Sequence, residues 1–197
     1  WPPERLLPVG AAVGADVPFC LVGGAAAVEG IGERVRTLPA GPPLWLVLVS
    51  PGLPLLTADV FRAWDALDPG RGAGGEAAGP RGPGEGESRW WARAAQALQR
   101  GDAAGLAACL HNDLAPAARR LCPEIDEAAG ALRAAGALGV GLSGSGPTVF
   151  GVAADEGHAR ELKKRVEAAG RLRHARWRCW AVPTASRGWE WCHEGPL

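Results

Sequence analysis

Apolar residues occur along the chain in short runs separated by proline and glycine, a pattern typical of a domain that mixes helices and strands. The run over residues 44–50 is apolar almost throughout and ends at Pro51-Gly52, which predicts a buried strand. Shorter apolar runs predict three more strands, at residues 138–142, 148–153 and 176–183.

Helix signals lie between these strands. Thr57 is placed to cap a helix that continues to about residue 67. Residues 90–136 are rich in alanine and leucine and predict several short helices. Asp155 is placed to cap a further helix that ends at Gly170.

The first 43 residues have a different character. Residues 1–13 predict the tail of a helix that begins upstream, and residues 14–20, around Asp16, predict a turn. Two short strands are expected at residues 25–28 and 34–38, joined through a glycine-containing connection.

From residue 44 onward the predicted order is strand, helices, strand, strand, helix, strand. This βαββαβ order predicts an α+β fold of the ferredoxin-like type. Residues 70–88 contain eight glycines and little apolar bulk, which predicts a flexible surface insertion. Residues 184–197 are expected to form a polar tail.

Charge and cysteine content narrow the function classes. The chain has 21 basic and 21 acidic residues, so its bulk charge favours neither nucleic acid nor an anionic membrane as partner. Its five cysteines are scattered, with no C-x-x-C pair, which argues against a disulfide framework or a zinc site and for reduced thiols in the cytoplasm. We therefore expect no bound structural metal. The sequence also contains no methionine, even at position 1, and we expect it to be a fragment of a longer protein.

One glycine-serine segment, hereafter the Gly-Ser loop, has the most distinctive chemistry. It consists of six consecutive residues: Ser143, Gly144, Ser145, Gly146, Pro147 and Thr148. With Gly139 and Gly141 it formally matches the dinucleotide pattern G-x-G-x-x-G, but that motif requires a following helix and the sequence here predicts a strand. A serine-hydrolase elbow fails because Ser145 stands where glycine is needed. Two interpretations remain open, an anion-binding loop and a plain glycine-rich turn.

Asp16 has a similar ambiguity. An aspartate two residues before a proline is often a turn or cap residue. A carboxylate beside a substrate hydroxyl could instead accept its proton during phosphoryl transfer.

Several motifs occur together and in order. They are GADVPF at 14–19, EG-x-GE at 29–33, VSPG at 49–52 followed by Thr57, Asn112-Asp113-Leu114, and SGSGPTVFG at 143–151. Together they resemble the GHMP kinase family, and in particular its branch that phosphorylates the small molecule diphosphocytidyl methylerythritol.

The resemblance implies a role for each matching residue. Asp16 would be the catalytic base and Thr57 would lie near the substrate, while the Gly-Ser loop would line the active centre. Residues 44–183 would be the C-terminal GHMP kinase domain, with residues 1–43 a remnant of the N-terminal, ribosomal S5 domain 2-like, domain. ATP and Mg²⁺ would be bound mainly by the N-terminal region upstream of residue 1. That region would also supply a phosphate loop and a catalytic lysine, so residues 1–197 alone are expected to be inactive.

Two alternatives stay open. The first is another GHMP kinase, of the mevalonate or homoserine type. The second is a non-catalytic ferredoxin-like module that binds a partner or RNA through a basic-aromatic strip. That strip would consist of Arg171, Arg173, Arg176, Trp177, Arg178 and Trp180. Because the total charge is balanced, a helix end and a strand with solvated arginines is the favoured explanation of this strip.

Overall fold

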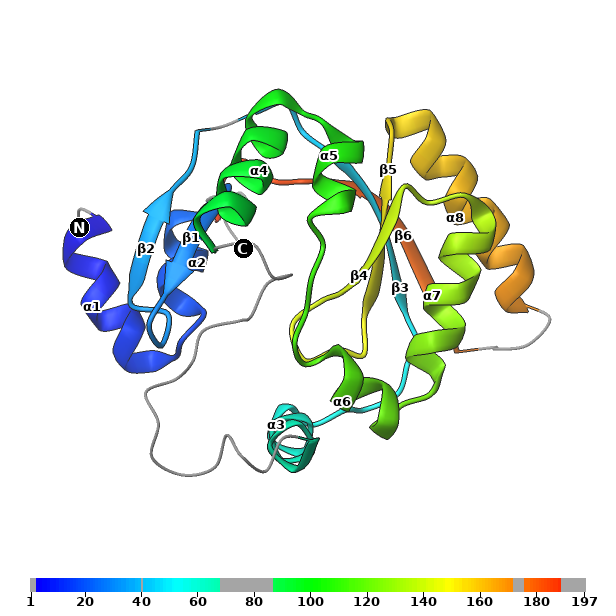
Figure 1. Ribbon diagram of the computed structural model, residues 1–197, viewed down its shortest axis with the longest axis horizontal. Coiled ribbons are helices and arrows are strands. Elements are labelled where there is room, and N and C mark those ends of the chain that lie inside the picture. Colours follow the sequence, from blue (N-terminus) through cyan, green and yellow to red (C-terminus); the bar gives the residue numbers. More distant parts are fainter. Residues whose placement is uncertain (1–2, 40, 68–86, 172–175, 189–197) are drawn as a thin grey trace, which may run out of the picture.

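The structure is a computed structural model, and it describes residues 3–39, 41–67, 87–171 and 176–188. An N-terminal segment contains helices α1 (Pro3–Val13) and α2 (Val17–Val22). Strands β1 (Ala26–Glu29) and β2 (Arg34–Thr37) follow as an antiparallel hairpin. Figure 1 shows this segment in blue beside the larger part of the chain.

The larger part is built on a four-stranded sheet in the order β4-β5-β3-β6, with every neighbouring pair antiparallel. The strands are β3 (Trp45–Ser50), β4 (Gly139–Leu142), β5 (Val149–Ala153) and β6 (Arg178–Pro183). The central pair is formed by the first and third strands of the βαββαβ order, which is the ferredoxin-like arrangement. The α+β prediction is thus confirmed.

Six helices connect these strands within the described residues: α3 (Thr57–Leu67), α4 (Glu87–Arg100), α5 (Ala103–Ala108), α6 (Ala115–Leu121), α7 (Glu124–Ala135) and α8 (Glu156–Arg171). Helices α7 and α8 pack on one face of the sheet. Their side chains Leu132 and Leu162 are fully buried with Val47 and Val149 of the sheet. Because successive strand residues point to opposite faces, these valines belong to the core face.

Helices α4 and α5 cover one end of the opposite face. Leu44, Ala103 and Val152 form a second, smaller buried cluster there. Gly139 allows α5 to approach, because a Cβ atom at this position would lie 2.7 Å from the Cβ of Ala107. The start of α8 follows its sequence signal. Asp155 Oδ1 accepts a hydrogen bond from His158 N at 2.8 Å.

The structure corrects several local expectations. The predicted turn over residues 14–20 is wrong beyond Asp16, because Val17 to Val22 form helix α2 with Pro18 in its first turn, where a missing N–H has no cost. Thr57 is the first residue of α3 and not its cap, since Leu56 O accepts the hydrogen bonds from Asp59 N and Val60 N. The predicted insertion at 70–88 ends too late, because α4 begins at Glu87, and residues 68–86 lie outside the described residues.

The segment after β6 is part of the fold as far as Gly188. Thr184 N donates to Leu44 O at 2.8 Å, and Thr184 Oγ1 accepts from Leu44 N at 3.1 Å. The chain then returns to the N-terminal segment (Figure 1), where a Cβ atom on Gly188 would lie 1.9 Å from Cys20 O. Residues 184–188, predicted as a polar tail, therefore pack against the end of α2.

Candidate functional site

The Gly-Ser loop joins β4 to β5 and is closed by backbone hydrogen bonds. Ser143 N donates to Thr148 O at 2.9 Å, and Gly146 N donates to Ser143 O at 2.8 Å. Gly144 and Gly146 have φ angles of 55° and 88°, in the left-handed region that favours glycine. The peptide bond between Gly146 and Pro147 is cis. The glycines therefore allow a tight, well-defined loop that carries three hydroxyl-bearing residues.

A side-chain contact joins this loop to the start of α3. The Oγ1 atom of Thr57 and the Oγ atom of Ser145 lie 2.9 Å apart in a hydrogen bond that spans 88 positions of sequence. Two residues that the family resemblance assigns to the active centre thus meet in space. Because each hydroxyl can donate and accept, the pair can offer one free donor to a bound group.

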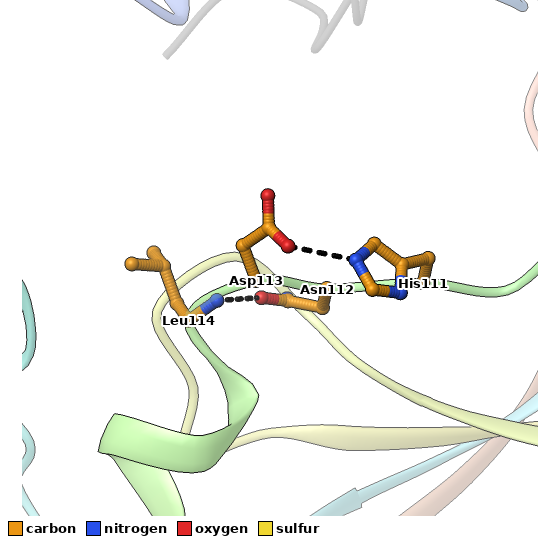
Figure 2. Close-up of polar contacts among 4 residues, drawn as sticks. All are labelled: His111, Asn112, Asp113 and Leu114. Atoms are coloured by element: carbon orange, nitrogen blue, oxygen red, sulfur yellow. Dashed lines mark hydrogen bonds and ion pairs between the residues drawn. The ribbon is translucent and has the colours of Figure 1, made fainter. Parts of the chain in front are cut away.

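Asn112 makes the second connection to the loop, from the segment between α5 and α6. Its Nδ2 atom donates to Leu142 O at 3.0 Å and to Gly144 O at 2.8 Å. Its Oδ1 atom accepts from Leu114 N at 2.9 Å, as Figure 2 shows. From the sequence alone, Asn112 has no role beyond membership of a motif. One available signal was its rarity, because it is the single asparagine among 197 residues.

The residues on either side of Asn112 form a polar pair. His111 Nε2 and Asp113 Oδ1 lie 2.7 Å apart (Figure 2), and their side chains are 37% and 27% exposed. This pair is separate from the carboxamide contacts of Asn112 with the loop. Loss of the interaction between His111 and Asp113 would therefore leave the contacts between Asn112 and the loop in place.

Asp16 lies at the N-terminus of α2, in the N-terminal segment. Its residue is exposed, and its side chain makes no capping hydrogen bond with the helix. Among the described residues, no hydrogen bond or ion pair joins the Asp16 carboxylate to the Gly-Ser loop or to Thr57. The structure thus assembles Thr57, Asn112 and the loop into one site, whereas Asp16 presents a solvated carboxylate on a different element.

Other candidate sites find little support in the described part of the chain. There, no group of three or more histidine, cysteine or acidic residues is placed to hold a metal ion. The four described cysteines, at positions 20, 109, 122 and 179, form no disulfide with one another. Among the helices that the structure describes, none has the length and apolar character to cross a membrane.

The described part of the basic-aromatic strip combines exposed side chains, Arg176 among them, with one half-buried tryptophan. Trp177 packs against the main core, whereas Arg178 and Trp180 on β6 are exposed. Residues 172–175, and with them Arg173, lie outside the described residues. The burial of Trp177 agrees with the interpretation of this region as a helix end followed by a strand.

Comparisons with known proteins match this chain to kinases of one family. Residues 94–172 match the family described as GHMP kinases C terminal. A relative from Moorella thermoacetica, 4-diphosphocytidyl-2-C-methyl-D-erythritol kinase, is 44% identical over 165 residues, which cover 84% of this chain and 53% of that protein. The chain thus spans about half the length of the curated relatives that it matches.

Solved structures give the same result for the fold. The crystal structure of 4-(cytidine 5'-diphospho)-2C-methyl-D-erythritol kinase matches with a TM-score of 0.64 and 35% identity, over 90% of this chain and 56% of that one. Homoserine kinase from Cytophaga hutchinsonii matches with the same TM-score but 20% identity, over 87% of this chain and 52% of that one, and shows the shared fold alone. By these matches the chain is similar to the GHMP kinases, and the model of their C-terminal domain matches residues 94–172.

Proposed function

We propose that this chain is the C-terminal part of an ATP-dependent kinase. Its reaction would be phosphorylation of the 2-hydroxyl of 4-diphosphocytidyl-2-C-methyl-D-erythritol, a step in the non-mevalonate route to isoprenoids. The observation that carries the proposal is the contact between Thr57 and Ser145, because it joins two motif elements that lie 88 positions apart into one site. The 44% identity with the Moorella relative favours this substrate over those of other family members.

The proposed chemistry assigns proton transfer to Asp16. Its carboxylate would accept the proton of the substrate hydroxyl while that oxygen bonds to the γ-phosphorus of ATP. The bond between the γ-phosphorus and the bridging oxygen breaks, and ADP leaves with that electron pair. An exposed carboxylate without a capping hydrogen bond keeps its acceptor oxygens available for this role.

The Gly-Ser loop and Thr57 would position the reacting groups. Phosphoryl transfer depends mainly on alignment and on electrostatic stabilisation, so a loop with defined backbone geometry suits this purpose. Thr57 would contact the substrate with its hydroxyl. Ser145 holds that hydroxyl in place through their shared hydrogen bond.

We propose that residues 1–43 are a remnant of the N-terminal kinase domain and that residues 44–183 form the C-terminal domain. The catalytic lysine and the loop that holds the ATP phosphates would then come from residues outside this sequence. The described residues supply no cluster of metal ligands, so a Mg²⁺ ion would enter with the nucleotide and be held mainly by its phosphates. We also place the protein in the cytoplasm, in keeping with the lack of a disulfide among its described cysteines.

A chimera provides the test. The part of the Moorella relative upstream of its matched region is joined to this chain, and the product is assayed with ATP and 4-diphosphocytidyl-2-C-methyl-D-erythritol. We expect ADP formation that depends on this substrate, with homoserine and mevalonate inactive. The chain alone, residues 1–197, is expected to show no turnover.

The Asp16→Asn variant of the chimera tests the proposed base. The substitution preserves shape but removes the proton acceptor, so we expect kcat to fall by a factor of about 10² to 10⁴. Asp65→Asn, which alters another aspartate of the described chain, is the matched control for loss of one negative charge. Full activity in Asp16→Asn would overturn the assignment, and activity of the chimera with homoserine instead would overturn the substrate.

A further inference from the structure

We propose that Asn112 is a positioning residue that fixes the conformation of the Gly-Ser loop through its side-chain carboxamide. The catalytic consequence of this inference rests on the proposed kinase function, whereas its structural part does not. Asn112 makes its contacts with the loop through backbone carbonyl groups. It therefore acts on the site through the loop.

The geometry uses nearly the whole hydrogen-bonding capacity of the carboxamide. Nδ2 donates to Leu142 O, on the last residue of β4, and to Gly144 O, inside the loop, at 3.0 and 2.8 Å. Oδ1 accepts from Leu114 N at 2.9 Å, which fixes the orientation of the amide plane. The two carbonyl groups belong to residues on either side of Ser143, so one side chain holds the first turn of the loop at both ends.

Among the common side chains of this length, asparagine alone can make this set of contacts. An aspartate has the same shape and can accept from Leu114 N, but its ionised carboxylate has no N–H to donate. It would instead face two carbonyl oxygens. The sequence contains eight aspartates and one asparagine, and the asparagine occupies the position where two donors are needed.

The loop needs such an anchor because its own backbone is permissive. Gly144 and Gly146 lack the Cβ atoms that restrict other residues, and their φ angles of 55° and 88° are positions that glycine occupies and leaves easily. Ser145 lies between them and carries the hydroxyl that meets Thr57. Loss of the Asn112 bonds would therefore loosen the position of Ser145 relative to α3.

Hydrogen exchange measured on residues 1–197, without the chimera, tests whether Asn112 fixes the conformation of the Gly-Ser loop. The Gly146 amide, which donates to Ser143 O at 2.8 Å, reports on the loop, and the Leu138 amide, which donates to Val152 O at 2.9 Å, reports on the far end of the same hairpin. In Asn112→Asp at neutral pH we expect the protection factor of Gly146 to fall about tenfold or more, with Leu138 unchanged. Asp113→Ala, which removes the acceptor of the adjacent pair with His111, should leave both amides protected.

The pH dependence distinguishes hydrogen bonding from a general packing defect. Two facing carbonyl groups disfavour the ionised form of a carboxylate introduced by Asn112→Asp, so its pKa should lie above the usual value for aspartate. As pH falls through that raised pKa, the protonated carboxyl can donate one bond, and the protection of Gly146 should partly recover. Asn112→Ala introduces no titratable group. Its Gly146 amide should therefore stay unprotected both at neutral pH and at the lower pH.

Kinetics of the chimera test the catalytic part. We expect Asn112→Asp to lower kcat about 10- to 100-fold, with a smaller change in KM, because the loop aligns reacting groups. Unchanged Gly146 protection in both Asn112→Asp and Asn112→Ala would overturn the inference, as would a uniform loss of protection that includes Leu138. If the unsubstituted chimera is inactive, the proposed function fails, and the exchange experiment still decides the role of Asn112.

Discussion

The hydroxyl groups of Thr57 and Ser145 are hydrogen-bonded at 2.9 Å, which joins the first residue of α3 to the Gly-Ser loop. Neither element is placed beside the other by local sequence. Their meeting depends on the antiparallel pairing of β3 with β5, which brings the end of β3 next to the beginning of β5. Thr57 follows the end of β3 along the chain, and Ser145 precedes the beginning of β5.

This contact predicts a measurable coupling. Thr57→Val and Ser145→Ala each remove one hydroxyl, and a double-mutant cycle isolates the energy of their interaction. We expect a coupling of about 0.5–1 kcal/mol in the free energy of unfolding, because a neutral hydrogen bond between exposed residues contributes modestly. Urea titration measures it, and Thr37→Val on the exposed edge of β2 serves as the control for Thr57→Val. A coupling of zero would show that the bond does not persist in solution.

The core makes a second prediction. Leu132 on α7 is fully buried among core residues, whereas Leu121 on α6 is 45% exposed. We expect Leu132→Ala to lower the free energy of unfolding by about 2–5 kcal/mol, because it removes buried apolar surface and leaves a cavity. Leu121→Ala should have a much smaller effect in the same chemical denaturation experiment. Equal losses for the two variants would contradict the packing of α7 against the sheet.

A third prediction concerns the contact between the segment after β6 and the end of α2. A Cβ atom on Gly188 would lie 1.9 Å from Cys20 O, so alanine there must displace backbone. We expect Gly188→Ala to destabilise the chain by about 1–3 kcal/mol, as for other overpacked sites. Faster proteolytic cleavage near Thr184 should accompany this loss.

Gly130 provides the matched glycine for that experiment. It lies in the interior of α7, and a Cβ atom there would meet nothing within 4 Å. Gly130→Ala should therefore raise the free energy of unfolding by about 0.5–1 kcal/mol, because alanine loses less backbone entropy in a helix. Thermal melts of the two variants should shift in opposite directions, and a shift in the same direction would count against the close approach at Gly188.

The thiol of Cys179 makes a prediction for alkaline pH. Burial, with the negative charge of Glu167 adding to it and Lys163 opposing it, raises the pKa of Cys179 from 9.0 to about 11. The folded state therefore holds this proton more tightly than the unfolded state. The resulting stability is fully present below pH 9.0 and is lost as the pH rises towards about 11.

Cys179→Ala tests this pH dependence. The variant lacks the titrating group, so its stability should decline less between pH 9.0 and about 11 than that of the parent. Urea midpoints at several pH values measure the difference. Parallel declines in the two proteins would show that Cys179 does not contribute.

Much of the fold was predictable because its signals are local. The continuous apolar run that became β3 and the cap at Asp155 each depend on nearby residues. Helix α2 was not predicted, because a proline close to an aspartate is as typical of a turn as of a first helical turn. The sequence order of strands and helices then limited the topology to the ferredoxin-like plan, which the sheet order bears out.

The sequence by itself thus determined most of the elements, their order and the motif residues, because propensities, caps and apolar periodicity act over a few positions. The tertiary structure alone decided which of these residues meet. It joined Thr57 to Ser145 across 88 positions and placed the Asn112 carboxamide on carbonyls 30 and 32 positions away. It also brought Gly188 back to the end of α2. Such contacts depend on how strands pair and helices pack, and no local pattern encodes that geometry.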